Sequence, residues 1–476
     1  MMRDVIVVGG GTSGFIAAVA AARSGARTLL LEQAGYLGGT MTGGLVPGMV
    51  SMRHQPWKNV ETIVGLENSY DGDQVTRGIA QEFIDRLIAE GGAFGSPGKS
   101  TVRVMFDPEI MKWVMNAMVT EAGAEIRFHS KVSELFKEGN SVTGVKTYSG
   151  DEYFAKVVVD TTGDGDVAAL AGADYEVGEG GDPRYIQPMS FYFVMGDVDF
   201  EKIIEYLETG PEPYSAEYVR RARSLKSAGK PFSLRGFPTL IKKALEAGDY
   251  PIPYGTDTVN PEAHIGLIRP AFRDGKTRYN ISMHNIDMAY HVDPTDNAQL
   301  SEAMVAMREF TVKIARFFRK YVPGFEDAYL LQTADLVGIR ESRRIKGDYT
   351  LTKDDVLQRR EFHDAVGYCG AAVDVHNEEG GRARTKMIAI EKSGAYQVPY
   401  RILLPAGLNG ILIAGRPVST DRIANGSIRQ QAGCFVTGQA AGLAASIAAQ
   451  DDVQPRDIRI EKLQDLLMGQ GAILRL

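Results

Sequence analysis

The chain has 476 residues, of which 44% are hydrophobic and 24% charged, and these ordinary globular values exclude a disordered or fibrous protein. The length predicts two or three structural units. A formal net charge of −7, with no block of like charges, argues against a nucleic-acid partner. Two cysteines, Cys369 and Cys434, exclude a disulfide scaffold, a CxxC redox motif and a cysteine-built metal site. No apolar stretch approaches the roughly 18 residues of a membrane helix, so we expect a soluble cytoplasmic protein with no membrane partner. We also expect no bound metal.

The first 32 residues contain a βαβ pattern with a glycine-rich turn. The β-branched run Val5–Val8 predicts a buried parallel strand, and the alanine-rich segment from Phe15 to Ser24 predicts a helix. Thr28–Leu31 predicts a second strand, which is followed by Glu32. The turn before the helix fits the GxGxxG pattern, whose residues are Gly9, Gly11, Thr12, Ser13 and Gly14.

Each position of this unit has a physical role in nucleotide binding. Gly9 permits the tight turn, Gly11 lets the backbone approach a pyrophosphate, and Gly14 allows the helix to pack closely on the strand. The helix N-terminus supplies N–H donors and a positive dipole, and Glu32 can accept hydrogen bonds from a ribose. The alternative is a glycine turn in an ordinary α/β protein. The complete strand–helix–strand unit with its terminal Glu32 favours a nucleotide.

The residues after this unit resemble those of a flavoprotein family. Glu32 to Gly39 reads E-x-x-G-x-L-G-G, and Gly43 and Gly44 follow, which is more glycine than a NAD domain requires. With the GGGxxG start, this is similar to the FAD-dependent oxidoreductase family of the glutathione-reductase-like flavoproteins. The resemblance spans residues 4 to 449 and departs between Ser51 and Thr76. Its later segments are 106–109, 157–166, 337–349, 373–376, 398–401, 410–416 and 434–442.

The resemblance implies an α/β fold with a Rossmann-like FAD-binding domain, whose parallel sheet is built from both chain ends, and a mixed α/β substrate domain. We expect the FAD-binding domain in residues 1–50, 101–181 and 396–476, an insertion or cap in 51–100, and the substrate domain in 182–395. The implied cofactor is FAD. The residues expected to hold it are Gly9, Gly11, Thr12, Ser13, Gly14, Glu32, Gln33, Gly38, Gly39, Thr40, Thr42, Gly43, Gly44, Val132, Thr162, Gly163, Asp164, Gly415, Arg416, Arg429, Gln430 and Gly433.

The C-terminal segment agrees with this fold from its own residues. Ile411–Ala414 is a short apolar strand that can rejoin the N-terminal sheet. The helix predicted from Ser427 to Gln450 has small residues at helical spacing, which permits close packing against another backbone. In the family, the N-terminus of this helix points at the flavin pyrimidine ring, where its dipole stabilises the negative charge of reduced flavin. Close packing without a ligand is the alternative.

The middle of the chain is left for the substrate, because both ends are committed to FAD. We predict a strand over Leu336–Ile345 with Arg340, Ser342 and Arg344 on one face. Arginines beside the flavin would suit an anionic or polyhydroxylated substrate, and Arg340 is the preferred candidate. The alternative is a solvated charged face.

Hydride transfer from a C–H bond to flavin N5 usually needs a base for the neighbouring proton. We expect His376, in the motif Val-Asp-Val-His, to be this base, and Arg340 and Arg401 to orient the substrate. Family topology would place Tyr400 and Arg401 close to the flavin. A purely structural, hydrogen-bonded His376 is the alternative, and His284 lies in another polar segment.

These inferences predict a two-domain FAD enzyme that transfers a hydride between a small polar substrate and flavin N5. The main alternative is an electron-relay flavoprotein subunit of a larger redox complex, although the two distant cysteines do not supply an iron–sulfur site. An RNA-modifying flavoprotein is disfavoured by the net charge, and a nucleotide-binding module without catalysis by the developed middle domain. The electron acceptor is open among oxygen, a quinone and a protein partner, and so is the oligomeric state.

Overall fold

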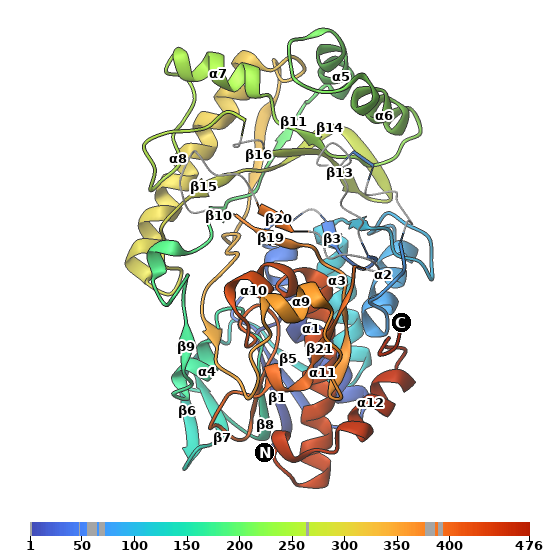
Figure 1. Ribbon diagram of the computed structural model, residues 1–476, viewed down its shortest axis with the longest axis vertical. Helices are drawn as coiled ribbons and strands as arrows, with labels where there is room; N and C mark the ends of the chain where they lie inside the picture. Colours follow the sequence, from blue (N-terminus) through green and yellow to red (C-terminus); the bar gives the residue numbers. More distant parts are fainter. Residues whose placement is uncertain are drawn as a thin grey trace.

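The structure is a computed structural model that describes residues 2–46, 48–54, 64–65, 72–262, 266–376, 386–388 and 394–476, with the backbone alone for 386–388. Figure 1 shows a lower domain that contains both chain ends and an upper domain formed by the middle of the chain. A mainly parallel sheet organises the lower domain and an antiparallel sheet the upper one. Of the insertion expected at 51–100, residues 55–63 and 66–71 lie outside the described residues.

The parallel sheet unites strands from the two ends of the chain. β1 (Arg3–Val8) lies between β2 (Thr28–Leu31) and β8 (Glu152–Asp160), while β5 (Glu125–Arg127) pairs with β2 and β22 (Ile411–Ile413) pairs with β8. All four pairs are parallel. The predicted βαβ unit and the return of the C-terminal strand to the N-terminal sheet are therefore confirmed.

Two long helices pack closely over this sheet. A Cβ atom at Gly438 of α11 (Gln431–Asp451) would lie 2.4 Å from the carbonyl oxygen of Ser13 in α1 (Thr12–Arg23), so only glycine allows this approach. The predicted close packing of the small-residue stripe is confirmed, although α11 begins after a break at 429–430. Among the described residues, α11 is the one helix long and apolar enough to cross a membrane, and 94% of its most apolar window is buried inside the protein.

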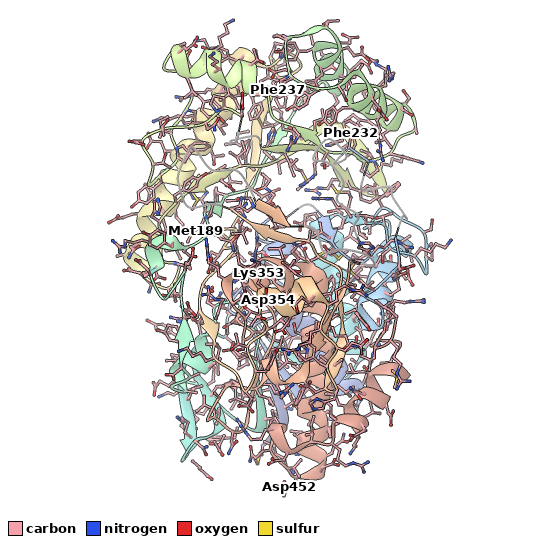
Figure 2. The ribbon with its side chains drawn as sticks, in the orientation of Figure 1. Met189, Phe232, Phe237, Lys353, Asp354 and Asp452 are labelled. Atoms are coloured by element: carbon pink, nitrogen blue, oxygen red, sulfur yellow. The ribbon has the colours of Figure 1, made fainter. Side chains whose placement is uncertain are left out.

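The upper domain is an antiparallel sheet covered by helices on its outer side (Figure 1). Its strand order is β12-β13-β14-β11-β16, and the long α8 packs on it through buried Met307, Phe310 and Ile314. Phe232 and Phe237, labelled in Figure 2, are buried in this domain's core. The elements are β10 (Met189–Ser190), β11 (Phe193–Gly196), α5 (Phe200–Thr209), α6 (Ala216–Ser227), β12 (Leu234–Arg235), α7 (Pro238–Glu246), β13 (Leu267–Arg273), β14 (Lys276–Asn285), β15 (Asp287–Ala289), α8 (Asn297–Tyr321) and β16 (Tyr329–Thr333).

Shorter elements complete the lower domain and the junction. They are β3 (Gly48–Val50), α2 (Ile79–Ala89), β4 (Arg103–Met105), α3 (Pro108–Glu121), β6 (Val132–Glu138), β7 (Ser141–Thr147), α4 (Asp166–Leu170), β9 (Tyr175–Glu176), β17 (Arg344–Ile345), α9 (Lys353–Gln358), β18 (Ala365–Cys369), β19 (Val373–Val375), β20 (Lys386–Ile388), β21 (Tyr396–Pro399), α10 (Arg422–Ile428) and α12 (Ile460–Gly469), with single 3₁₀ turns at Gly39–Met41, Pro183–Tyr185, Tyr400–Leu403 and Pro455–Asp457.

The hydrophobic cores move two of the expected domain boundaries. The upper core draws mainly on residues 189–337, whereas buried side chains of 345–375 belong to the lower core, so the substrate domain ends well before 395. Within the expected insertion, α2 also packs into the lower core, where the rings of Phe83 and Phe15 lie 4.7 Å apart. Apolar burial, rather than position along the chain, assigns these segments to the lower domain.

The strand predicted over Leu336–Ile345 is wrong. Only Arg344–Ile345 is a strand. In the rest of the segment, Leu336 donates its N–H to the carbonyl oxygen of Gly43, and Gly338 forms an isolated bridge with Ser190 of β10. Side chains do not alternate between two faces, because Glu341 and Arg344 are both buried and form an ion pair with each other. The charged residues of this segment therefore do not form the solvated face of a strand.

Candidate active site

A cavity of about 1230 Å³ extends between the two domains. One end lies at the turn between β1 and α1, and the other lies under the antiparallel sheet, where residues of β12, β13 and β14 line it. The carboxyl ends of the parallel strands open into the same space, which is where ligands of open α/β sheets bind. The cavity thus joins the predicted nucleotide site to the predicted substrate domain.

The nucleotide end is formed by the glycine turn and by the end of β2. Gly9 has a φ of +99°, and it is followed by lining residues of the first turn of α1. The Glu32 carboxylate accepts hydrogen bonds from the N–H groups of Gly10, at 2.5 Å, and Ala34, at 2.7 Å. Burial raises the pKa of Glu32, and the backbone N–H groups offset part of this rise. Its carboxylate is held at the position expected for a ribose-binding acid.

The glycine turn leaves room for a ligand beside its backbone. A Cβ atom built on Gly11 would meet only the Cα of Gly39, at 4.0 Å, so it would project into the cavity rather than into protein. The N-termini of α1 and α11 both reach the cavity, which provides positive dipole ends and N–H donors for anionic groups. This donor set fits the pyrophosphate and ribose of FAD.

Most of the residues predicted to hold the cofactor line this cavity. They are Gly9, Gly11, Thr12, Ser13, Glu32, Gln33, Gly39, Thr40, Val132, Thr162, Gly163, Asp164, Gly415, Arg416, Arg429 and Gln430. The others, which do not line it, are Gly14, Gly38, Thr42, Gly43, Gly44 and Gly433.

The predicted residues outside the cavity shape the backbone around it. A Cβ on Gly14 would lie 1.7 Å from the carbonyl oxygen of Gly9, and one on Gly433 would lie 2.1 Å from that of Ile428. Gly38 has a φ of +107°. The hydroxyl of Thr42, four residues later, donates to the Leu37 carbonyl oxygen at 2.7 Å. Gly43 and Gly44 face Tyr36 and Thr40 in the same way. The glycines among them allow close packing of the backbone around the cavity.

Arg416 ties the β8 turn to the segment that enters from the upper domain. Its guanidinium donates to the carbonyl oxygen of Gly163 at 2.7 Å and forms an ion pair with Asp164. It also donates to the carbonyl oxygen of Ile339. The neighbouring Gly415 has a φ of +88°, a conformation that glycine adopts at little cost. One arginine therefore fixes two walls of the cavity relative to each other.

His376 lies in the cavity wall between two carboxylates. Its Nδ1 is 2.8 Å from Oδ2 of Asp287, and its Nε2 is 3.4 Å from Oδ1 of Asp374. Arg340 pairs with the other oxygen of Asp287 at 2.7 Å and donates to Ser190 Oγ at 2.7 Å. All five residues come from separate strands or loops, except that Asp374 and His376 are two positions apart.

The charges around His376 favour its protonated form. Burial and the positive charge of Arg340 lower the pKa of His376, but the carboxylates of Asp287 and Asp374 outweigh them and raise it above its ordinary value. Burial would raise the pKa of Asp374, yet the neighbouring charges of His376, Arg429 and Arg340 hold it well below its usual range. An imidazole with two carboxylate partners is a stronger base than a solvated one.

Comparison of the sequence with known protein families identifies the family of this chain. The sequence model for FAD dependent oxidoreductases matches residues 4–467. The chain belongs to this family. It is therefore an FAD-dependent oxidoreductase, an enzyme whose cofactor is FAD.

Several solved flavoenzymes are similar to this oxidoreductase at low identity. A geranylgeranyl bacteriochlorophyll reductase-like protein from Thermoplasma acidophilum shares 14% identity over 98% of this chain and 84% of that chain, with a TM-score of 0.45. A variant of halogenase PltM in complex with FAD shares 12% identity over 98% and 74%, with a TM-score of 0.44. CabE, an aromatic hydroxylase from angucycline biosynthesis, shares 13% over 99% and 69%, with a TM-score of 0.42.

The oxidoreductase does not bring Tyr400 and Arg401 to the cavity, contrary to the sequence-based prediction. Tyr400 is 4% exposed and donates its hydroxyl to the Pro455 carbonyl oxygen at 2.8 Å. Arg401 pairs with Asp364 at 2.9 Å and lies over the ring of Tyr349. A 3₁₀ turn after β21 directs both side chains into the lower domain's own packing, so the prediction that they lie beside the flavin is wrong for this geometry.

Several cavity residues of the oxidoreductase were missed by sequence reasoning. Asp287 and Tyr192 stand in short polar or aromatic stretches without a motif, and Arg269 interrupts the apolar strand β13. Arg269 could have been recognised from the sequence as a charged residue in the middle of an apolar strand, because a charged side chain is rarely buried unless it is paired. Cys434 also lines the cavity, and burial raises the pKa of its thiol to about 11.

The other two arginines of the 336–345 segment, Arg343 and the predicted Arg344, lie in different places. Arg343 lines the cavity and pairs with Asp166 at 2.8 Å, while its guanidinium lies over the ring of Tyr175. Arg344 is buried and donates to the carbonyl oxygen of Gly178. Of the predicted arginines Arg340, Arg344 and Arg401, Arg340 is the one that shares the Asp287 carboxylate with His376.

Proposed function

We propose that this oxidoreductase transfers a hydride between a small polar substrate and flavin N5, with His376 as the proton acceptor. The observation that carries the proposal is the contact chain Arg340–Asp287–His376 in the wall of the FAD cavity. When bound, FAD supplies the two-electron chemistry at its N5. The substrate class suggested by the lining arginines is anionic or polyhydroxylated.

In this proposal the residues around His376 prepare it to receive a proton. In the neutral ring, the Nδ1–H group donates a hydrogen bond to Asp287, and Nε2, beside Asp374, is then the nitrogen that would take the hydroxyl or amine proton of the substrate. As the substrate C–H bond breaks with its electron pair, the O–H or N–H proton passes to Nε2 and a C=O or C=N bond forms. The resulting imidazolium lies between Asp287 and Asp374, whose negative charges stabilise it.

Arg340 is a positioning residue in this scheme. It donates to Pro188 O at 2.5 Å and to Ser190 Oγ at 2.7 Å, so its guanidinium is fixed from two sides. Ser190 also donates to Asp287, at 3.1 Å. These contacts hold the Asp287 carboxylate, and through it the ring of His376, in one orientation.

Replacing His376 with asparagine tests the proposal. We expect flavin reduction by a substrate, followed without oxygen as bleaching of the visible flavin band, to slow by about 10²–10⁴-fold, while the FAD content stays unchanged. Screening hydroxy acids, amino acids and polyols on the wild type would first identify a reductant. His363→Asn is the matched control, because the side chain of His363 is 76% exposed and lies outside the cavity lining. A wild-type rate in His376→Asn would remove His376 from the mechanism.

The oxidant can be assigned with the same preparation. After substrate-driven bleaching, oxygen, a soluble quinone or an added protein fraction is mixed with the reduced enzyme. Return of the visible band within the turnover time identifies the acceptor. If the visible flavin band returns rapidly with a protein fraction and does not return with oxygen or the quinone, the electron-relay alternative is favoured over a free-standing oxidase or dehydrogenase.

A further inference from the structure

The antiparallel sheet presents one face to the cavity, and that face carries arginines. Arg235 of β12 is the cross-strand partner of Leu267 on β13, and Leu267 is the partner of Asn285 on β14. Arg269 is two residues beyond Leu267, so it projects from the same face. All four residues line the cavity. The upper end of the cavity is therefore roofed by two guanidiniums and an amide on neighbouring strands.

Arg269 is buried to an unusual degree for a charged side chain. It is 2% exposed and is the largest of the fully buried side chains in the described part of the molecule. Its Nε donates to Ser233 Oγ at 2.7 Å, which fixes the plane of the guanidinium. Burying a charge is costly unless charged or polar groups surround it, and Arg269 keeps this charge in the wall of the cavity, where an anionic group could reach it.

Tyr192 marks the point where further cations converge. It lines the cavity and is 8% exposed. Burial raises its pKa, while the positive charges of Arg269, Arg340 and Arg103 act in the opposite direction. Arg103 belongs to β4 in the lower domain, where it pairs with Val50 of β3. Guanidiniums from both domains thus lie near one phenol hydroxyl.

The acidic residues of the cavity do not neutralise this end uniformly. Asp287 is engaged by Arg340 and His376, and Asp164 by Arg416. Glu262 and Asp335 also line the cavity. Among the described residues, no ion pair involves Arg235, whose guanidinium is half-buried. The described carboxylates therefore leave Arg235 without an ion pair at this end of the cavity.

We propose that Arg103, Arg235, Arg269 and Tyr192, hereafter the arginine wall, bind a carboxylate or phosphate group of the substrate. Guanidinium groups match the planar oxygens of carboxylates and the oxygens of phosphates, and a buried phenol adds a further donor. The wall adjoins Arg340, which contacts the Asp287 partner of His376. The inference rests on the proposed function: the substrate is a small organic acid or phosphate ester whose oxidisable C–O–H or C–N–H group faces His376.

The binding experiment uses the FAD-loaded protein and no turnover. Malonate and its neutral isostere malonamide are titrated by isothermal calorimetry at matched ionic strength, with inorganic phosphate in a third titration. We expect malonate or phosphate, but not malonamide, to bind. The tighter of the two anions distinguishes an organic acid from a phosphate ester as the source of the oxyanion.

Variants identify the residues that bind the anion. Arg235→Gln and Arg269→Gln are expected to weaken anion binding by roughly tenfold or more, as is usual for a lost charge-assisted hydrogen bond. Arg278→Gln is the control, because Arg278 is on β14 of the same sheet but outside the cavity lining. Arg269 is buried and its variant can fail to fold, so half-buried Arg235 keeps the test decisive. Equal affinities for malonate and malonamide, or unchanged anion binding by Arg235→Gln, would overturn the proposal.

The result is distinguishable from a failure of the proposed function. His376→Asn should bind malonate as the wild type does, because His376 is not part of the arginine wall. If anion binding depends on Arg235 while His376→Asn reduces flavin at the wild-type rate, the anion site stands and the proton-acceptor role falls. If His376→Asn is slow but no anion binds, the chemistry stands and the arginine wall does not.

Discussion

Replacing Gly438 with alanine tests whether the contact between α1 and α11 controls the cofactor site. The added Cβ would lie 2.4 Å from the carbonyl oxygen and 2.9 Å from the Cα of Ser13. Since carbon atoms pack best at about 3.5–4.0 Å, the two helices would have to separate locally by about 1 Å. Ser13 lines the cavity, so the separation would also move a residue of the nucleotide end.

The expected cost can be estimated from overpacking. Forcing a methyl group into a filled contact costs about 1–3 kcal/mol, and the better helix propensity of alanine returns up to about 1 kcal/mol. The net loss then lies between about 0 and 3 kcal/mol, and we take the middle of this range, about 1–2 kcal/mol, as the expected value. If this strain is expressed in the cofactor-bound state, the dissociation constant for FAD rises by about 5- to 30-fold.

The assay compares urea unfolding of the apoprotein and fluorescence titration of FAD for Gly438→Ala and for Gly469→Ala. Gly469 ends α12, and a Cβ atom added there would meet no other atom within 4 Å, so its variant should match or exceed wild-type stability and bind FAD normally. Wild-type stability together with wild-type FAD affinity in Gly438→Ala would refute the idea that close α1–α11 packing supports the site.

Three further predictions follow from single residues. Burial lowers the pKa of His284 to about 3, so below pH 6.5 the unfolded chain takes up a proton that the folded chain does not. The wild type should therefore lose about 1.4 kcal/mol of unfolding free energy for each pH unit from 6.5 down to about pH 3. His284→Phe should lack this slope in urea unfolding at pH 7, 6 and 5, and parallel slopes in the two proteins would contradict the assignment. Glu32→Gln should weaken FAD binding by roughly tenfold, measured by fluorescence titration, and an unchanged affinity would exclude a ribose contact. The neighbouring carboxylates raise the pKa of His376 above 6.5, so the rate of substrate oxidation should fall as the pH drops through this pKa and the base becomes protonated. Asp287→Asn should move the midpoint of the pH–rate profile of flavin reduction to lower pH. An unmoved midpoint would assign the titration to another group.

The parts of the fold that sequence could predict are those in which neighbours in the chain are also neighbours in space. The β1–α1–β2 unit is of this kind, because the glycine turn, the helix and Glu32 lie within one short segment. The long helix α8 is another, since its apolar stripe is visible in its own sequence. The match of Ile411–Ile413 to the N-terminal sheet came from the family resemblance as much as from the residues themselves.

The errors arose where distant partners decide the structure. Charged and apolar residues alternate around position 340, which predicted a strand with two different faces. In the structure Glu341 and Arg344 are both buried, and they form an ion pair with each other. Asp287 was missed because its partner His376 is far away in the chain and no spacing links them. Tyr400 was placed near the flavin by its proximity to β22, whereas its hydroxyl bonds to Pro455.

The pairing of β22 with β8 also has a consequence for how the protein is made. The N-terminal sheet receives its last parallel strand, and α1 its partner α11, only from the final part of the chain. During synthesis the antiparallel domain is complete long before the ribosome reaches these elements, and domains generally fold as units once they emerge. Until then the nascent lower domain has no partner for the Val158–Asp160 part of the β8 edge and no cover for α1. A chain truncated before residue 411 should therefore aggregate and should not retain FAD.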